Sequence, residues 1–260
     1  RDGTTVRVTQ QAPYFTLDLP LWARDGDRWI QRIVRLRGES AEVEIPTHVT
    51  RLLLDPEVWL LGSIKYDLGY SADDWAALYT QAPNAAQKAR LIADLPGSFK
   101  TELGKRLVDG ESLPTLRAQL LDNVGSDASG LLLRNAGHAD PFVRQSALRA
   151  MARQPKSESL LGVLRSVWET DSNDLLRRAA LESLVTLTGD EAIVRKAWTT
   201  DGFQETFRTF ALGWWAANQP DEARAKCLAE VASPRNETLR VFALDRLRAP
   251  EGHLQRDRAA

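Results

Sequence analysis

The sequence predicts a multidomain protein with β structure followed by α structure. We expect a small antiparallel β-sandwich over residues 1–62 and an α-α superhelix over residues 63–260. Three observations lead to this fold class. Apolar residues alternate with polar ones up to about residue 61, they recur every three or four residues from Ser71 onward, and a helical motif then repeats at a nearly constant interval.

The alternation that indicates strands is clearest from Phe15 to Leu21 and returns from Val43 to Ile45. The strand candidates are residues 6–8, 15–21, 29–36, 43–45, 49–54 and 58–61. Turn-forming clusters separate them at residues 25–27, 38–40 and 55–56. Because about sixty residues of strand are few for independent stability, we expect this β region to pack against the helices that follow or against a segment upstream.

Helix signals begin at Ser71, whose hydroxyl can cap a helix with Asp73 and Asp74 in its first turn. One face of that helix then carries Trp75, Leu78 and Tyr79. Asn84 can cap the next helix, which we expect to end at Leu95, before Pro96-Gly97. An irregular pair of helices is predicted over residues 111–124 and 127–137, closed by Gly137.

Internal repetition is the strongest signal in the sequence. Four segments share the pattern apolar-Arg-x-x-Ala-Leu, and they are residues 143–148, 176–181, 207–212 and 239–244. Their arginines, Arg144, Arg177, Arg208 and Arg240, lie 33, 31 and 32 residues apart. A period of this length built from helices predicts a solenoid of HEAT-like repeats, in which each helix pair buries its apolar face against its neighbours.

Second helices with apolar stripes of their own fall between these segments, at residues 160–168, 193–198 and 227–231. Trp168 and Trp198 occupy comparable places, 30 residues apart. Cap signals recur too, because Asp140 precedes Pro141 and both Asp174 and Asn236 stand at equivalent sites. The repeat therefore predicts two helices per unit, with a capped start for each arginine-bearing helix.

The repeated arginines admit two interpretations. They could form a basic ladder for phosphates or peptide carboxylates. However, an acid precedes each arginine within the same first turns, at Asp140, Asp174, Glu205 and Glu237. Ion pairing along the repeats accounts for the arginines without a ligand, and we expect most of these guanidinium groups to be paired.

The chain offers few groups for catalysis or metal binding. His48, His138 and His253 are far apart and none belongs to a His-Glu-x-x-His motif. Cys227 lies on the apolar face of its helix, which indicates a buried structural thiol. The sequence has no Gly-x-Ser-x-Gly elbow, phosphate-binding loop or dinucleotide fingerprint, and residues 125–130 are expected to be a plain loop. We predict no catalytic, cofactor-binding or metal-ligating residue in these 260 residues.

Three further features have both a structural and a functional interpretation. The paired acids Asp25/Asp27 and Asp73/Asp74 stand at a turn and at a helix start, where acids occur for local backbone reasons. The adjacent Trp214 and Trp215 could mark a binding surface, although packing between repeats explains at least one of them. Residues 236–238 fit a glycosylation sequon that doubles as a helix cap.

Composition excludes several partner classes. The net charge is −1, from 34 basic and 35 acidic residues, so no bulk attraction for nucleic acid or an anionic membrane is expected. No uninterrupted apolar run is long enough to span a bilayer. We expect a soluble protein, cytoplasmic or periplasmic. Because the chain opens with Arg1, soon enters a strand pattern and shows no signal peptide, we expect it to be a fragment.

A short strand-rich module joined to a helical solenoid resembles the C-terminal half of the M1 family of zinc aminopeptidases. The residues that carry the resemblance are Val6 to Gln10, the F-x-L-x-L-P-L stretch from Phe15 to Leu21, Leu54-Asp55-Pro56, Trp59-Leu60-Leu61, Trp75, Leu78, Arg90 and Ala93. They cover about residues 4–95 in order, and the repeats continue from there.

The resemblance implies that this chain plays a non-catalytic role in its parent protein. The zinc motif of the family, His-Glu-x-x-His with a downstream Glu, has no counterpart in this sequence, so no catalytic residue is carried over. We expect zinc in a catalytic domain that is missing here, with that domain and the peptide substrate as partners. The alternative is a free-standing HEAT-repeat scaffold for protein–protein interaction.

Overall fold

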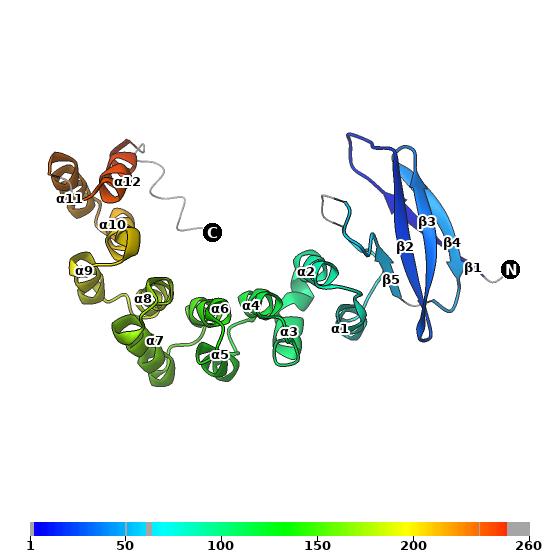
Figure 1. Cartoon of the computed structure of the whole chain (residues 1–260), viewed down its shortest axis with the longest axis horizontal. Coiled ribbons are helices and arrows are strands. Elements are labelled where there is room, and N and C mark those ends of the chain that lie inside the picture. Colours follow the sequence, from blue (N-terminus) through cyan, green and yellow to red (C-terminus); the bar gives the residue numbers. More distant parts are fainter. Residues whose placement is uncertain (1–2, 50, 61–63, 234, 249–260) are drawn as a thin grey trace. The chain divides into compact units, whose positions relative to one another are not determined.

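A computed structural model of the chain describes residues 3–49, 51–60, 64–233 and 235–248. Within these ranges five strands are followed by twelve α-helices (Figure 1). The predicted order of β structure and then α structure is confirmed. The chain forms two compact units, residues 1–124 and residues 125–260. The predicted change of domain at residues 62–63 falls on positions outside the described residues.

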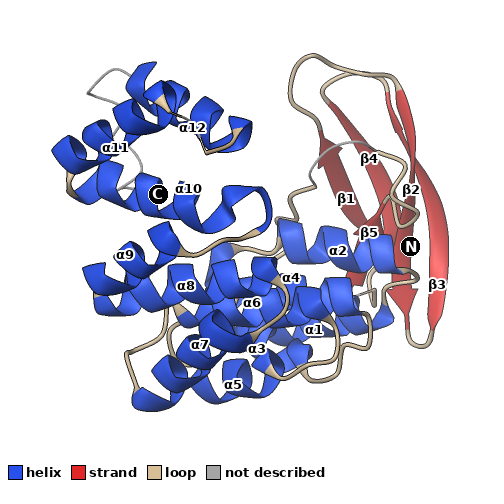
Figure 2. Cartoon of the chain, turned by 60° about the vertical axis from the view of Figure 1, so that its left-hand side comes forward, coloured by secondary structure: helices blue, strands red, loops and turns tan. Residues whose placement is uncertain are grey.

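The strands of the first unit form two antiparallel sheets. Strands β1 (Gly3–Thr9) and β4 (Ser40–Pro46) make a two-stranded sheet. Strands β2 (Leu17–Asp25), β3 (Arg28–Leu36) and β5 (Arg51–Leu54) make a second sheet in the order β3-β2-β5 (Figure 2). Asp25 pairs with Arg28, so residues 26 and 27 form the predicted turn, in which Gly26 has φ of +54°.

Residues of both sheets share one apolar cluster. Its buried members are Leu19, Leu21, Ala23, Val34, Leu36, Ile45, Leu52, Leu54 and Ile64. Because side chains alternate along a strand, Leu53 points to the other face of β5, where it packs with Trp75 and Leu78. The β region therefore packs against the helices that follow it. This was one of the two arrangements expected from the short length of the β region.

Two tyrosine hydroxyls occupy hydrogen-bonding positions of β5 that no strand fills. The Leu52 N–H donates to the Tyr70 hydroxyl at 2.7 Å, and the Leu54 N–H donates to the Tyr66 hydroxyl at 3.2 Å. Burial raises the pKa of Tyr66 to about 12, so the hydroxyl stays neutral. The edge of this sheet is thus covered by side chains.

One strand prediction was wrong, and one predicted strand begins two residues later than expected. Val58 to Leu60, from the candidate strand at 58–61, form no strand. They follow a turn at Pro56-Glu57, Val58 has φ of +60°, and Leu61 lies outside the described residues. The N–H groups of Trp59 and Leu60, which a ladder would need, donate instead to the Asp55 carboxylate. Phe15 precedes β2 and is 58% exposed, with its N–H bound to the Gln10 side chain.

Four helices complete the described part of the first unit, and they are α1 (Ala72–Gln81), α2 (Ala85–Asp94), α3 (Gly97–Val108) and α4 (Pro114–Asp122). The predicted caps are confirmed, because Ser71 forms a capping box with Asp74 and Asn84 accepts from the Gln87 N–H. Helices α3 and α4 approach closely at Gly104, where an added Cβ would lie 3.0 Å from the Leu120 carbonyl oxygen.

The second unit is helical throughout its described part. Its elements are α5 (Ser129–Ala136), α6 (Pro141–Met151), α7 (Glu158–Thr170), α8 (Asp174–Thr188), α9 (Glu191–Thr199), the short 3₁₀ helix η1 (Phe203–Glu205), α10 (Thr206–Asn218), α11 (Pro220–Ala232) and α12 (Glu237–Arg248). Apart from α6 and α7, consecutive helices of this unit pack on one another, and α6, α8, α10 and α12 also pack in series. The four repeated segments lie in these four helices, and their alanines, Ala147, Ala180, Ala211 and Ala243, are fully buried.

The repeated caps are confirmed at two sites and wrong at the third. Asp140 accepts from the N–H groups of α6, and Asn236 accepts from the Leu239 N–H at 2.9 Å. Helix α8 begins one residue earlier than predicted, because Asn173 is its cap and Asp174 is its first residue. Asp174 instead accepts from Arg177 and from the Phe203 N–H.

Candidate functional site

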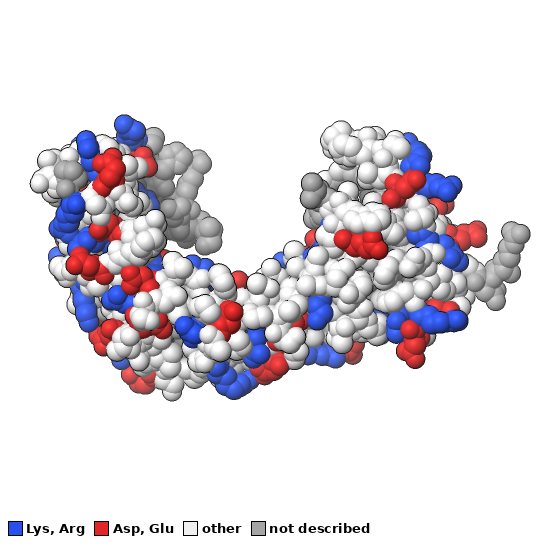
Figure 3. All heavy atoms as spheres, viewed as in Figure 1, with Lys and Arg blue, Asp and Glu red and all other residues white. Residues whose placement is uncertain are grey.

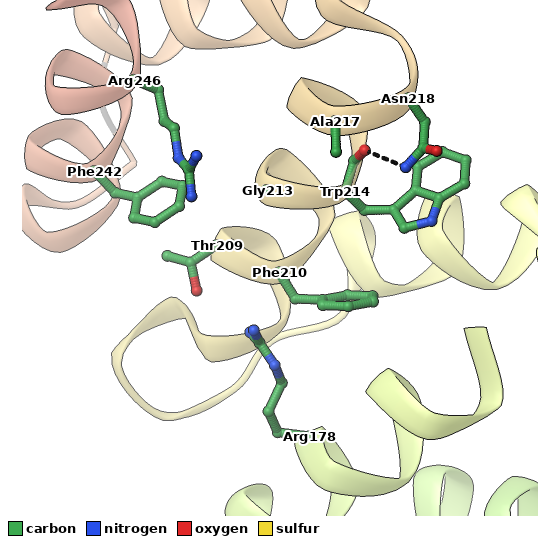
Figure 4. A pocket seen from close by; sticks show the side chains of 9 residues that line it. All are labelled: Arg178, Thr209, Phe210, Gly213, Trp214, Ala217, Asn218, Phe242 and Arg246. Carbon is green, nitrogen blue, oxygen red and sulfur yellow. Dashed lines mark hydrogen bonds between the residues drawn. The ribbon is translucent and has the colours of Figure 1, made fainter. Parts of the chain in front are cut away.

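A pocket of about 320 Å³ lies among α8, α10 and α12 in the second unit (Figure 4). Its lining residues are Arg178 from α8, Thr209, Phe210, Gly213, Trp214, Ala217 and Asn218 from α10, and Phe242 and Arg246 from α12. The pocket thus combines two guanidinium groups with three aromatic rings, and none of its lining residues is acidic. It is the candidate binding site considered in the described part of the chain.

Helix α10 forms the floor of the pocket through residues spaced four apart. Phe210, Trp214 and Asn218 follow one another on one row. The opposite side of the same helix is core, where Trp215 is 1% exposed and meets Trp198 edge-on at 5.7 Å between ring centroids. Adjacent helical residues point about 100° apart, so the two neighbouring tryptophans serve different surfaces. The expectation that packing explains at least one of them is confirmed for Trp215.

Gly213 leaves the centre of the floor without a side chain. Figure 4 shows Arg246 and Phe242 on one side of α10 and the ring of Trp214 on the other, with Gly213 between them. A Cβ added at Gly213 would meet the Arg246 guanidinium at 3.9 Å, an ordinary contact distance. A glycine inside a helix costs about 0.5–1 kcal/mol relative to alanine, and neither steric crowding nor a positive φ requires it here.

The two pocket arginines differ in how they are engaged. Arg178 stacks on the Phe210 ring at 4.7 Å, and it donates to the Glu182 carboxylate at 2.5 Å and to the Thr206 carbonyl. Arg246 stacks on the Phe242 ring at 5.1 Å but makes no hydrogen bond or ion pair with any described residue. The Arg246 guanidinium therefore keeps its donors available to a ligand in the pocket.

The repeated arginines are engaged within the protein, as predicted for most of them. Arg177 pairs with Asp174 at 3.0 Å, Arg208 with Glu205 at 2.5 Å, and Arg240 with Glu237 at 3.7 Å. Arg144 departs from the prediction. Its guanidinium donates to the carbonyls of His138 and Ala139, each at 3.0 Å, while the Asp140 carboxylate is used as a helix cap.

A shared role links three of these arginines. Arg177 donates to the Trp168 carbonyl at 3.1 Å and Arg208 donates to the Trp198 carbonyl at 3.0 Å, so each closes the end of the preceding helix. Arg144 likewise binds two carbonyls of the loop that follows α5. Arg177 also lies 4.6 Å from the Phe207 ring centroid. These contacts give the repeated arginines a structural role that needs no ligand.

The two described histidines have local partners, and the cysteine is buried. His48 Nε2 lies 2.9 Å from Asp25 and is 60% exposed, His138 Nδ1 accepts from the Asp140 N–H, and His253 lies outside the described residues. Cys227 is 2% exposed on its helix, which confirms the predicted burial. Burial raises the pKa of its thiol, although the nearby Arg246 charge opposes that shift.

The paired acids have local partners. Asp27 pairs with Arg24 at 3.4 Å and Asp73 pairs with Arg106. Hydrogen bonds from the Ser71 hydroxyl and N–H lower the pKa of Asp74, which belongs to the capping box. Among the described contacts, Asp74 therefore serves the backbone at the helix start, whereas Asp25, Asp27 and Asp73 pair with side chains.

The glycine-rich stretch at residues 125–130 is a loop that runs into the start of α5. Gln154, which is 4% exposed, accepts from the Ala128 N–H at 2.8 Å and donates to the Gly125 carbonyl at 2.7 Å. The Ala128 N–H, a donor that a bound phosphate could use, is therefore taken by a side chain of the same unit.

Within the described ranges, no group of three or more His, Cys, Asp or Glu residues could hold a metal ion. No helix of the described residues is long and apolar enough to cross a membrane. On the face of the second unit shown in Figure 3, basic and acidic side chains are intermixed.

Sequence reasoning singled out Trp214 but missed the rest of the pocket. Phe242 and Arg246 stand four residues apart on α12, and Arg178 stands some thirty residues before Phe210, so the helix stacking alone brings them together. Gly213 within an otherwise strong helix pattern is the local signal that could have pointed to an open surface. No protein-family model matches the sequence, and no curated protein matches it.

Proposed function

We propose that this chain is the non-catalytic C-terminal region of an M1-like zinc aminopeptidase. In this role the strand-rich part is a β-sandwich spacer and the helices form a HEAT-like cover over the peptide-binding cleft of the parent protein. The sequence order and the contacts of the residues that resemble the family support the proposal. The partners would be the catalytic domain, which would carry the zinc, and the peptide substrate.

The observation that carries the proposal is a buried joint built from the residues of the resemblance. Asp55 is fully buried, and its carboxylate accepts from the N–H groups of Trp59 at 3.0 Å and Leu60 at 2.8 Å. Arg90 of α2 donates to Asp55 at 2.7 Å and to the Leu60 carbonyl at 2.5 Å. These residues, separated by up to 35 positions, thus form one network where the strands meet the helices.

The finer fold assignments belong to the same proposal. A shared apolar cluster between the β1-β4 and β3-β2-β5 sheets supports a sandwich. The serial packing of α6, α8, α10 and α12, with α7, α9 and α11 between them in sequence, supports HEAT-like repeats. Solenoid surfaces of this kind suit the confinement of an extended peptide.

The purified 260-residue chain tests the proposal directly. It should hydrolyse no aminoacyl anilide, and metal analysis after dialysis against micromolar zinc should find well below one zinc ion per chain. The matched positive control is the natural full-length product assayed under the same conditions. Stoichiometric zinc in the chain, or turnover by the chain alone, would overturn the assignment.

The alternative function is a HEAT-type scaffold that binds another protein. Large apolar side chains at the starts of three helical segments favour it, because Phe142, Leu175 and Phe203 are 62%, 59% and 68% exposed. Phe142 and Leu175 each stand two residues before a repeated arginine, whereas Phe203 lies in η1. Exposed apolar residues of this kind are typical of interaction surfaces. A start codon directly before Arg1 would favour the scaffold over the peptidase region.

A further inference from the structure

We propose that the pocket among α8, α10 and α12 binds an aromatic carboxylate, with the carboxylate on Arg246 and the ring against Phe210 and Trp214. This site goes beyond the proposed function, because a ligand could bind there in either a peptidase region or a scaffold. Three properties of the pocket support the assignment: its uncompensated charge, its aromatic surface and its open centre.

The positive charge of the pocket favours an anionic ligand. Two guanidinium groups line it and no lining residue is acidic. Glu182 on α8 pairs with Arg178 at 2.5 Å. Of the two pocket arginines, Arg246 is therefore the one that makes no hydrogen bond or ion pair with a described residue. A half-buried guanidinium presents a planar fork of donors that matches a carboxylate in a bidentate arrangement.

The aromatic surface of the pocket favours a ligand with a flat apolar ring. Phe210 and Trp214 lie four residues apart on α10, so their rings neighbour each other on one side of the pocket. Both residues are half-buried and so can still contact a ligand. Aromatic rings favour edge-to-face or offset contacts with another ring, so an aromatic ligand gains more here than an aliphatic one.

The open centre of the pocket at Gly213 allows one ligand to contact both Arg246 and the aromatic rings of α10. In Figure 4, Arg246 lies across Gly213 from Trp214, and no side chain stands between them at Gly213. The volume of about 320 Å³ is at the lower end for small-molecule sites. A single fused ring with a short carboxylate arm fits that size.

This chemistry can come from two sources, a free aromatic acid or the carboxyl end of a peptide whose last residue is aromatic. Calorimetric titration of the full chain can distinguish them. The probes are indole-3-acetate, its neutral isostere indole-3-acetamide, the peptide Gly-Gly-Trp and the same peptide with an amidated C-terminus. We expect at least one of the two acids to bind, and each acid that binds to do so at least tenfold more tightly than its amide.

Matched variants locate the binding site. Arg246→Gln should weaken acid binding at least tenfold, whereas Arg224→Gln, the same change at an exposed position of α11, should leave binding unchanged. Gly213→Leu should abolish binding by filling the centre of the floor. Its control is Gly162→Leu on α7, where an added Cβ meets nothing within 4 Å.

Circular dichroism and the melting temperature show whether each variant is folded. If Arg246→Gln does not fold, Arg246→Lys replaces it, because a lysine keeps the charge but loses the bidentate fork. Tight binding of indole-3-acetate alone identifies a free acid, and binding of Gly-Gly-Trp alone identifies a peptide end; either outcome supports the proposal. Equal binding of acid and amide, no binding of either acid at 5 mM, or an unchanged affinity in folded Arg246→Gln overturns it.

Discussion

Removing the arginine from the buried joint at Asp55 should destabilise the first unit severely. Arg90 has an 8% exposed side chain and Asp55 a fully buried one, with 2.7 Å between the guanidinium and the carboxylate. Removing one partner of a buried ion pair costs about 3–5 kcal/mol, because the other charge stays buried without compensation. In Arg90→Met the carboxylate keeps the N–H donors of Trp59 and Leu60, so we expect the lower end, about 3 kcal/mol.

Hydrogen exchange measures this loss where it arises. A destabilisation of about 3 kcal/mol should make the most protected amides of α1, α2 and β5 exchange on the order of 100-fold faster. Arg35→Met is the matched control, since Arg35 is exposed on β3, and surface changes of this kind stay within about 0.5 kcal/mol. An effect of Arg90→Met no larger than that of the control would refute the reasoning.

A double-mutant cycle separates the ion pair from the loss of packing. Asp55→Asn keeps an acceptor oxygen but removes the charge, so Arg90→Met should cost less in that background than in the parent chain. We expect a coupling free energy of about 1–3 kcal/mol. Additive costs would show that the Asp55 charge is not what Arg90 stabilises.

Three further predictions concern single side chains. Burial raises the pKa of Glu111, but hydrogen bonds led by that from the Tyr79 hydroxyl outweigh it and hold the pKa below its ordinary 4.5. The ionised carboxylate therefore stabilises the fold above pH 4.5, and this stabilisation is lost as the pH falls through the lower folded pKa. Tyr79→Phe should cost about 1.5–3 kcal/mol at pH 7 and less in acid, and urea unfolding that shows equal losses at both would contradict this. Gly202→Ala should cost about 1–3 kcal/mol, because its Cβ would lie 2.5 Å from the buried Phe207 ring. The control Gly162→Ala should instead gain about 0.5–1 kcal/mol in thermal unfolding, and a neutral Gly202→Ala would show that the ring can move. Phe207→Ala should cost about 3–5 kcal/mol, because the ring is fully buried against Trp168 at 4.8 Å, and a loss below 1 kcal/mol in the same assay would contradict that packing.

The features that local chemistry decides were predictable from the sequence. The caps at Ser71, Asn84 and Asp140 depend on one side chain and the next few N–H groups, and all three are confirmed. The repeat was visible because each copy buries the same alanine against its neighbours, and three of the four also bury the leucine that follows it. The cap at Asp174 was misplaced by one residue, since Asn173 beside it offers an equally good acceptor.

Features that depend on distant partners were not predictable. The segment from Val58 to Leu60 has a strand composition, but Asp55 takes its N–H groups and a helix 30 residues away takes the Leu60 carbonyl. Arg144 was predicted to pair with Asp140, but the Asp140 carboxylate accepts from the first N–H groups of α6, and Arg144 donates to the His138 carbonyl instead. The pocket joins side chains from three helices, and only the stacking of those helices sets their distances.

The coding sequence upstream of Arg1 tests the central claim most directly. If the chain is the C-terminal region of an M1-like aminopeptidase, the same reading frame continues upstream and encodes His-Glu-x-x-His with a glutamate further along. A start codon directly before Arg1, or a long upstream frame without that zinc motif, would contradict the claim.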